Sequence, residues 1–152
     1  MVKLVDVGGG ALALTHRPKL RDLPALRAAG ASHVVTLLSA SEQAEQLGKA
    51  VEEAGLAWVW VPMVGGGIPD EERTILLARE LDSLRELIAG GARVVVHCSA
   101  GIHRTGMFGY ALLRRIGLSS EEARGKLAAL RDVTAEGVGE ERMRWGDGLE
   151  KP

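Results

Sequence analysis

The side chains best suited to chemistry lie together in residues 97–106, which read HCSAGIHRTG. Cys98 is the only cysteine of the chain, and Arg104 follows it six positions later, with Thr105 directly behind. A cysteine thiolate is a strong nucleophile. An arginine offers a planar pair of donors that fits two oxygens of a phosphate group. This spacing therefore predicts a nucleophilic thiolate at the bottom of a phosphate-sized loop.

The residues on either side predict a loop between a strand and a helix. An apolar run, Val94 to Val96, leads into the loop, and a helix-forming segment leads out of it. In such a loop successive backbone N–H groups turn inward, and the helix N-terminus adds further unpaired donors. Gly101 allows backbone conformations that are closed to other residues. The positive surroundings favour a thiolate at Cys98, which would attack phosphorus to form a phosphocysteine, and Thr105 would donate a hydrogen bond to the departing sulfur.

The stretch resembles the signature of the protein tyrosine phosphatase superfamily: His-Cys, five residues, Arg, then Ser or Thr. In its small size the chain is similar to the compact, dual-specificity-like members of this superfamily rather than to the larger tyrosine-specific domains. The resemblance implies a cysteine-based phosphatase in which Cys98, Arg104 and Thr105 are catalytic. It also implies a set of phosphate-binding loop residues, namely Ser99, Ala100, Gly101, Ile102, His103 and Arg104. We expect no metal and no cofactor, because Cys98 and Arg104 supply the nucleophile and the charge stabilisation.

The general acid is the point at which the chain departs from this pattern. The superfamily usually places an aspartate upstream of the cysteine, shortly after a proline and a hydrophobic residue. Gly65 stands at that position here, and residues 56–69 contain no acidic residue. Asp70, alone or together with Glu71 or Glu72, would reach the site from a glycine-rich loop, unless Asp70 only caps the following helix. Alternatively His103 donates the proton, or the protein has no dedicated acid, a loss that typically costs about 10²–10⁴-fold in rate.

Alternating strands and helices must position this loop. We expect strands at residues 3–7, 11–14, 33–38, 57–61 and 93–97, and helices at 19–29, 41–54, 69–89, 105–116 and 123–131. Alternation within the fourth strand puts Trp58 and Trp60 on one face, with Val59 and Val61 on the other. The order implies an α/β fold: a single domain with a central, mostly parallel sheet flanked by helices on both faces. The site would lie at the carboxyl ends of the strands.

Length and composition agree with one domain over residues 1–152. The chain has 152 residues, of which 46% are hydrophobic, enough for one sizeable core. The formal net charge of −1 gives no strong attraction to nucleic acid or to anionic membranes. No apolar run approaches the roughly 18 residues of a membrane helix, and a single cysteine suits a reducing compartment. We therefore expect a cytoplasmic monomer without nucleic-acid or membrane partners.

Several residues near the loop have two interpretations each. His97 either holds the loop carbonyls and tunes Cys98, or is an ordinary core histidine. Arg17 and Lys19 either border the site or are solvated surface residues. Asp132 and Thr134 either orient the hydrolytic water or simply end a helix.

The leading hypothesis for function is hydrolysis of phosphate monoesters on phosphotyrosine or mixed phosphoprotein substrates. The loop carries no lysine pair for a polyphosphorylated inositol, and the near-neutral chain offers no basic track for RNA. Two alternatives stay open. One is a phosphatase of a small phosphorylated metabolite, and the other is a phosphate-recognition module whose catalysis is impaired because of Gly65.

Overall fold

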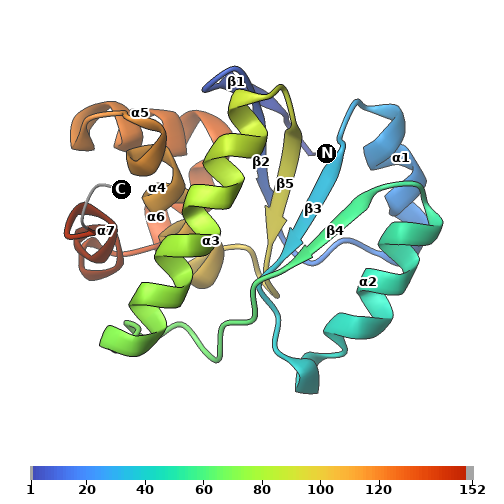
Figure 1. Cartoon of the computed structure of the whole chain (residues 1–152), viewed down its shortest axis with the longest axis horizontal. Coiled ribbons are helices and arrows are strands. Elements are labelled where there is room, and N and C mark those ends of the chain that lie inside the picture. The colour runs from blue at the N-terminus through green and yellow to red at the C-terminus, as the bar shows by residue number, and fades with distance from the viewer. Residues whose placement is uncertain (1, 150–152) are drawn as a thin grey trace.

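Five strands form one sheet in the computed structural model, which describes residues 2–149. The strands are β1 (Val5–Val7), β2 (Gly10–Thr15), β3 (His33–Thr36), β4 (Ala57–Trp60) and β5 (Arg93–His97). Their order across the sheet is β1-β2-β5-β3-β4, and only the β1–β2 pair is antiparallel (Figure 1). The sheet is thus mostly parallel, as the sequence predicts.

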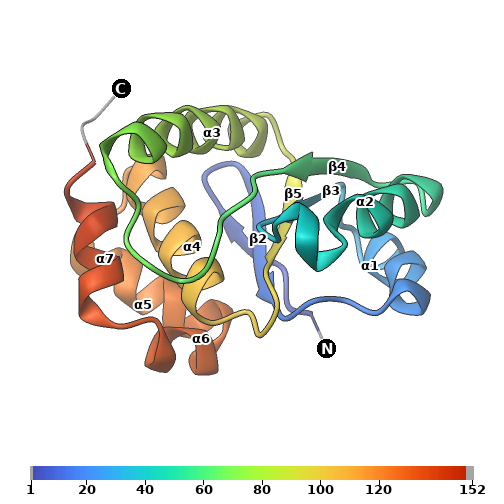
Figure 2. The ribbon, with the colours of Figure 1, turned by 90° about the horizontal axis from the view of Figure 1, so that it is seen from below.

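Helices cover both faces of this sheet (Figure 2). The α-helices are α1 (Leu23–Ala28), α2 (Ala44–Glu53), α3 (Glu71–Ala89), α4 (His103–Ile116), α5 (Ser120–Leu130), α6 (Asp132–Gly137) and α7 (Glu140–Asp147). Two 3₁₀ turns, Leu20–Asp22 and Ala40–Glu42, precede α1 and α2. Helices α1 and α2 lie on one face, and α3 to α7 lie on the other. A central strand covered on both faces must be apolar throughout, and Val94, Val95 and Val96 are fully buried.

Each face of the sheet has its own hydrophobic core, because successive side chains of a strand point to opposite faces. Trp58 and Trp60 pack against the core on the α1/α2 face, whereas Val61 belongs to the core on the other face and Val59 packs against it. This division confirms the two-residue period predicted for the segment. Cys98 belongs to the core on the α3/α4 face.

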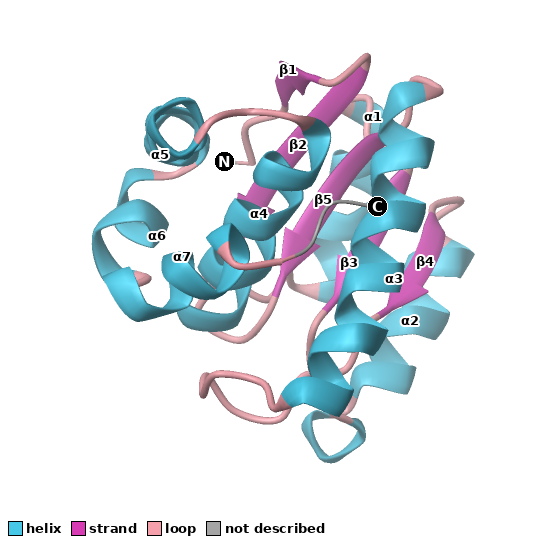
Figure 3. Ribbon diagram, turned by 60° about the vertical axis from the view of Figure 1, so that its left-hand side comes forward, coloured by secondary structure: helices cyan, strands magenta, loops and turns pink. Residues whose placement is uncertain are grey.

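The strand register brings the start of the Cys98 segment to the middle of the sheet. His97, the last residue of β5, pairs with Thr15 of β2 on one side and with Thr36 of β3 on the other. Strands β2, β5, β3 and β4 all point the same way, so their carboxyl ends share one edge (Figure 3). Ligand sites of open α/β sheets lie at this edge, and the Cys98 segment begins there.

The helix boundaries depart from the sequence expectations in several places. Helix α4 begins at His103 rather than at residue 105, and α5 begins at Ser120 rather than at residue 123. The helix expected at 19–29 is a 3₁₀ turn followed by the short α1, and the one expected at 41–54 begins only at Ala44, after a second 3₁₀ turn. Beyond residue 131 the sequence predicts no element, yet α6 and α7 are present. Helix α7 is short and mostly polar, so its stability comes from packing. Gly146 of α7 packs closely on α4: a Cβ there would lie 3.0 Å from the Tyr110 ring and 3.2 Å from Ala111 Cα.

No helix within residues 2–149 has the length and apolar character needed to cross a membrane. Over the same residues, no three His, Cys, Asp or Glu side chains gather as metal ligands would.

Candidate active site

The Cys98 loop, residues 98–102, joins the end of β5 to the start of α4. Its backbone rests on the end of β2, where the Arg17 N–H donates to the Ser99 carbonyl oxygen at 2.8 Å. Gly101 has a φ of +74°, and a Cβ there would clash with the carbonyl oxygen of Thr15. Both the left-handed backbone and the close approach require glycine at this position. The residues predicted from the sequence, from Cys98 to Thr105, therefore lie together in the loop and in the first turn of α4.

The sulfur of Cys98 accepts a hydrogen bond from the helix that follows the loop. The Cys98 side chain is largely buried, and the hydroxyl of Thr105, from the first turn of α4, donates to Sγ at 3.0 Å. Thr105 is itself fully buried, which holds its hydroxyl in place. A negatively charged sulfur at this point would keep that hydrogen bond.

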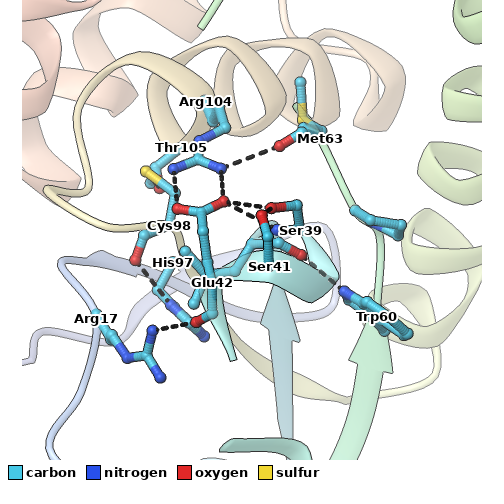
Figure 4. Close-up of polar contacts among 12 residues, drawn as sticks. Arg17, Ser39, Ser41, Glu42, Trp60, Met63, His97, Cys98, Arg104 and Thr105 are labelled. Carbon is cyan, nitrogen blue, oxygen red and sulfur yellow. Dashed lines mark hydrogen bonds and ion pairs between the residues drawn. The ribbon is translucent and has the colours of Figure 1, made fainter. Parts of the chain in front are cut away.

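Arg104 lies beside this sulfur and is held by Glu42, as Figure 4 shows. Its Nη1 donates to Glu42 Oε1 at 2.7 Å and to the Met63 carbonyl oxygen at 3.0 Å, and its Nη2 donates to Glu42 Oε2 at 3.0 Å. These contacts engage three of the five N–H donors of the guanidinium. Nε–H and one Nη2–H remain, and they form the parallel pair that suits two phosphate oxygens.

Sequence reasoning did not identify Glu42 as part of the site. The residue ends the 3₁₀ turn after β3, where its carboxylate and the Ser39 side chain cap each other's backbone. The backbone carbonyl of Glu42 accepts from the Arg17 side chain at 2.6 Å, so Arg17 borders the site. Hydrogen bonding to Arg104 lowers the pKa of Glu42 to about 2. The same hydrogen bond, with a smaller contribution from Cys98, raises the pKa of Arg104. The pair therefore stays charged across the neutral range.

His97 holds the first carbonyl of the loop from beneath. Its Nδ1 lies 3.0 Å from the Cys98 carbonyl oxygen, and its Nε2 lies 2.8 Å from the hydroxyl of Thr36. The ring is completely buried, and this burial lowers the pKa of His97 to about 4. His97 is therefore a neutral buried histidine that also fixes the loop, which combines the two interpretations of its sequence position.

Helix α6 supports the far side of the loop, which the sequence did not predict. The buried hydroxyl of Thr134 donates to the Gly101 carbonyl oxygen at 2.5 Å. Arg131 donates to the same oxygen at 2.8 Å and to the Ala100 carbonyl oxygen at 3.3 Å. These donors occupy the carbonyl side of the loop, so its N–H groups face the other way. Asp132 is exposed and accepts only from the Val133 N–H of its own turn.

A glycine-rich loop, residues 62–69, passes over the start of α4 and is held by arginines from three helices. Arg73 of α3 donates to the Pro62 carbonyl oxygen, and Arg104 donates to that of Met63. Arg142 of α7 donates to the Gly66 carbonyl oxygen at 2.6 Å. A Cβ on Gly66 would lie 3.1 Å from that of His103, so the loop backbone lies directly on the first residue of α4.

Comparison with known families identifies the chain. A sequence model described as "Tc-R-P: Polymorphic toxin system, DSP-PTPase phosphatase" matches residues 9–117, which include the whole Cys98 loop. The chain belongs to this family. No curated protein sequence matches it.

Solved structures show the same fold over nearly the whole chain. Tk-PTP in its active form is 27% identical, with a TM-score of 0.74 over 98% of this chain and 95% of that one. Kinase associated phosphatase, with its catalytic-site cysteine changed to serine, is 16% identical, with a TM-score of 0.73 over 95% and 89%. The core catalytic domain of the PP-IP phosphatase SIW14 from S. cerevisiae is 16% identical, with a TM-score of 0.68 over 98% and 85%. The fold is thus that of compact DSP-like cysteine phosphatases.

This member of the DSP-PTPase family carries no acid in its glycine-rich loop. Gly65 has a φ of +67°, and no atom lies within 4 Å of where its Cβ would be. Asp70 follows the loop as the N-cap of α3, where its carboxylate accepts from the Arg73 N–H at 2.8 Å. His103 is exposed at the start of α4, under the loop. Trp58 and Trp60 lie on the opposite face of the sheet and do not line the site.

Proposed function

We propose that the chain hydrolyses phosphate monoesters through a phosphocysteine intermediate on Cys98. The observation that supports this proposal is the arrangement of Cys98, Thr105 and Arg104, whose side chains meet at the Cys98 sulfur. Cys98 Sγ accepts from Thr105, and the neighbouring Arg104 uses three of its five N–H donors on Glu42 and Met63, which leaves one parallel pair beside the sulfur. Sγ attacks phosphorus, the ester oxygen leaves with a proton, and water then cleaves the S–P bond to release phosphate. Thr105 stabilises the sulfur anion as it departs in the second step.

The proposed substrates are phosphotyrosine or mixed phosphoprotein side chains. Cys98 is only 4% exposed and Arg104 only 9%, so the phosphate must reach groups that the surrounding residues largely cover. A long aromatic side chain can carry its phosphate to these groups more easily than a short one. A small aryl or alkyl metabolite would have to reach the same covered groups without the additional binding contacts that a peptide provides.

The test is hydrolysis of p-nitrophenyl phosphate by the purified chain in the presence of a chelator. Because Cys98 and Arg104 supply the nucleophile and the positive charge, removal of divalent metals is expected to leave the rate unchanged. Acid quenching during turnover should yield a peptide that contains Cys98 and has gained one phosphoryl group. Turnover that disappears with the chelator would contradict the mechanism. Phosphate binding without any turnover would instead support a phosphate-recognition module.

We propose Asp70 as the general acid, and its role can be separated from its capping role. Asn caps helices about as well as Asp, so Asp70→Asn preserves α3 while removing the proton donor. We expect this variant to slow phenyl phosphate by about 100-fold, because a poor leaving group needs its proton. The p-nitrophenyl ester, which leaves readily as an anion, should be slowed much less. Steady-state rates on the two esters give the comparison.

Two further variants complete this experiment. His103→Ala on the same two esters tests the alternative donor at the start of α4, and an equal or larger selective loss there would move the acid to His103. Gly65→Asp restores a carboxylate at the usual position, where space is free and Asp tolerates a left-handed backbone. It should accelerate phenyl phosphate if the chain lacks an efficient acid. No selective change in any of the three variants would show that the reaction uses none of these carboxyl or imidazole groups.

A further inference from the structure

A row of hydrogen bonds crosses the α1/α2 face of the sheet and ends at the Cys98 loop. The indole Nε1 of Trp58, on the edge strand β4, donates to Thr36 Oγ1 at 2.8 Å. Thr36 Oγ1 lies 2.8 Å from His97 Nε2, and His97 Nδ1 lies 3.0 Å from the Cys98 carbonyl oxygen. Three strands thus connect an edge tryptophan to the backbone of the proposed nucleophile.

The direction of each bond follows from what the groups at its two ends can do. The Cys98 carbonyl can only accept, so His97 Nδ1 must carry a proton. His97 is neutral, because burial lowers its pKa to about 4, and its Nε2 is therefore an acceptor. The hydroxyl of Thr36 must then donate to Nε2. The indole N–H of Trp58 is donor only and occupies the acceptor side of that hydroxyl, which directs the hydroxyl proton toward His97.

Trp58 is held rigidly enough to act on Thr36 in this way. One face of its ring lies against Gly48 of α2, where any Cβ would clash with the indole. Its ring stacks with that of Trp60, with centroids 5.6 Å apart and planes 18° from parallel. Trp60 has its own hydrogen bond, to the Leu38 carbonyl oxygen at 2.7 Å, and no bond to the Thr36–His97 pair. Thr36 and His97 are both fully buried, so water does not compete for their bonds.

We propose that Trp58 is a positioning residue for the Cys98 loop: its N–H orients the Thr36 hydroxyl, which holds His97 in the Nδ1–H form and thereby fixes the Cys98 carbonyl. The consequence for turnover rests on the proposed phosphatase function, but the tautomer does not. Trp58 touches neither the sulfur nor the phosphate site, and it acts only through Thr36 and His97.

The test replaces the two stacked tryptophans one at a time. Trp58→Phe removes the donor and keeps an aromatic ring, and Trp60→Phe is the matched control that loses a bond outside the row. The ¹⁵N shifts of His97 are read at neutral pH without substrate. In the unaltered chain Nδ1 should be protonated and Nε2 unprotonated. Trp58→Phe should move the two shifts toward each other, whereas Trp60→Phe should leave them in place.

Turnover gives a second readout of the same variants. The loss of one orienting hydrogen bond is expected to lower kcat for p-nitrophenyl phosphate about fivefold in Trp58→Phe. KM should change little, because none of the hydrogen bonds in this row involves Arg104 or Glu42. An inactive unaltered chain would contradict the proposed function and leave the ¹⁵N comparison valid.

A pair of changes at Thr36 covers the case in which Trp58→Phe does not fold. Thr36→Val has the same shape without the hydroxyl and should reproduce the change in the His97 shifts. Thr36→Ser keeps the hydroxyl and should restore the original pattern. The proposal is wrong if Thr36→Val leaves the His97 shifts unchanged, or if Trp60→Phe alters them as much as Trp58→Phe does.

Discussion

Replacing Cys98 with serine is expected to abolish phosphate ester hydrolysis while leaving phosphate binding intact. A serine hydroxyl is a weak nucleophile unless a base takes its proton. The neighbours of the Cys98 sulfur are donors rather than bases: the Thr105 hydroxyl donates to it, and the Arg104 guanidinium lies beside it. We expect kcat for p-nitrophenyl phosphate to fall by more than about 10⁴-fold, the scale on which nucleophile removal acts in other hydrolases.

Two measurements distinguish a lost nucleophile from a damaged loop. Calorimetric titration with inorganic phosphate should give a similar Kd for Cys98→Ser and the unaltered chain, since the loop N–H groups and Arg104 remain. The thermal midpoint should also change little, because the serine oxygen removes only a small buried volume and can still accept a hydrogen bond from Thr105. Residual hydrolysis within about 10-fold of the unaltered rate would rule out covalent catalysis by Cys98, because removal of a nucleophile lowers kcat by far more than that.

The loop itself was predictable because its chemistry is local in the sequence. Cys98, Gly101, Arg104 and Thr105 are neighbours along the chain, and the apolar strand before them predicts where the turn begins. The alternation that separates Trp58 from Val59 is equally local, and the structure confirms it. Such patterns need no knowledge of which strands are adjacent.

The supports of the loop could not be predicted, because they depend on strand order and on distant packing. Glu42 is 62 positions from Arg104, and its own neighbours indicate only an acidic residue in the first turn of a helix. Its role exists because β3 lies beside β5. Thr134 of α6 and Arg131, the N-cap residue of α6, reach the loop from a helix of 6 residues, which is too short to show an amphipathic pattern. The hydroxyl of Thr36 likewise becomes relevant only through its pairing with His97.

Replacing Arg104 with lysine is expected to reduce kcat/KM for aryl phosphates by about 10²–10³-fold, although the positive charge is kept. The guanidinium serves three acceptors at once: the two carboxylate oxygens of Glu42 and the Met63 carbonyl oxygen. It still has two parallel N–H groups for phosphate. A lysine ammonium is a point charge with three donors and cannot hold Glu42 in two-pronged fashion while also clamping two phosphate oxygens. Both kcat and the Kd for inorganic phosphate should therefore worsen.

Glu42→Gln separates the clamp from its anchor. The variant leaves the remaining N–H pair of Arg104 in place but replaces the charged two-pronged contact with a neutral contact to a single acceptor oxygen. We expect a smaller loss in kcat/KM, about 10-fold, on the scale of a hydrogen bond to a charged group. Because the pKa of Glu42 is held at about 2, its carboxylate is ionised throughout the assay range, so this loss should be constant between roughly pH 5 and 8. If Arg104→Lys lowers kcat/KM no more than Glu42→Gln does, the arginine acts as a simple positive charge and its two-pronged contact with phosphate is not used.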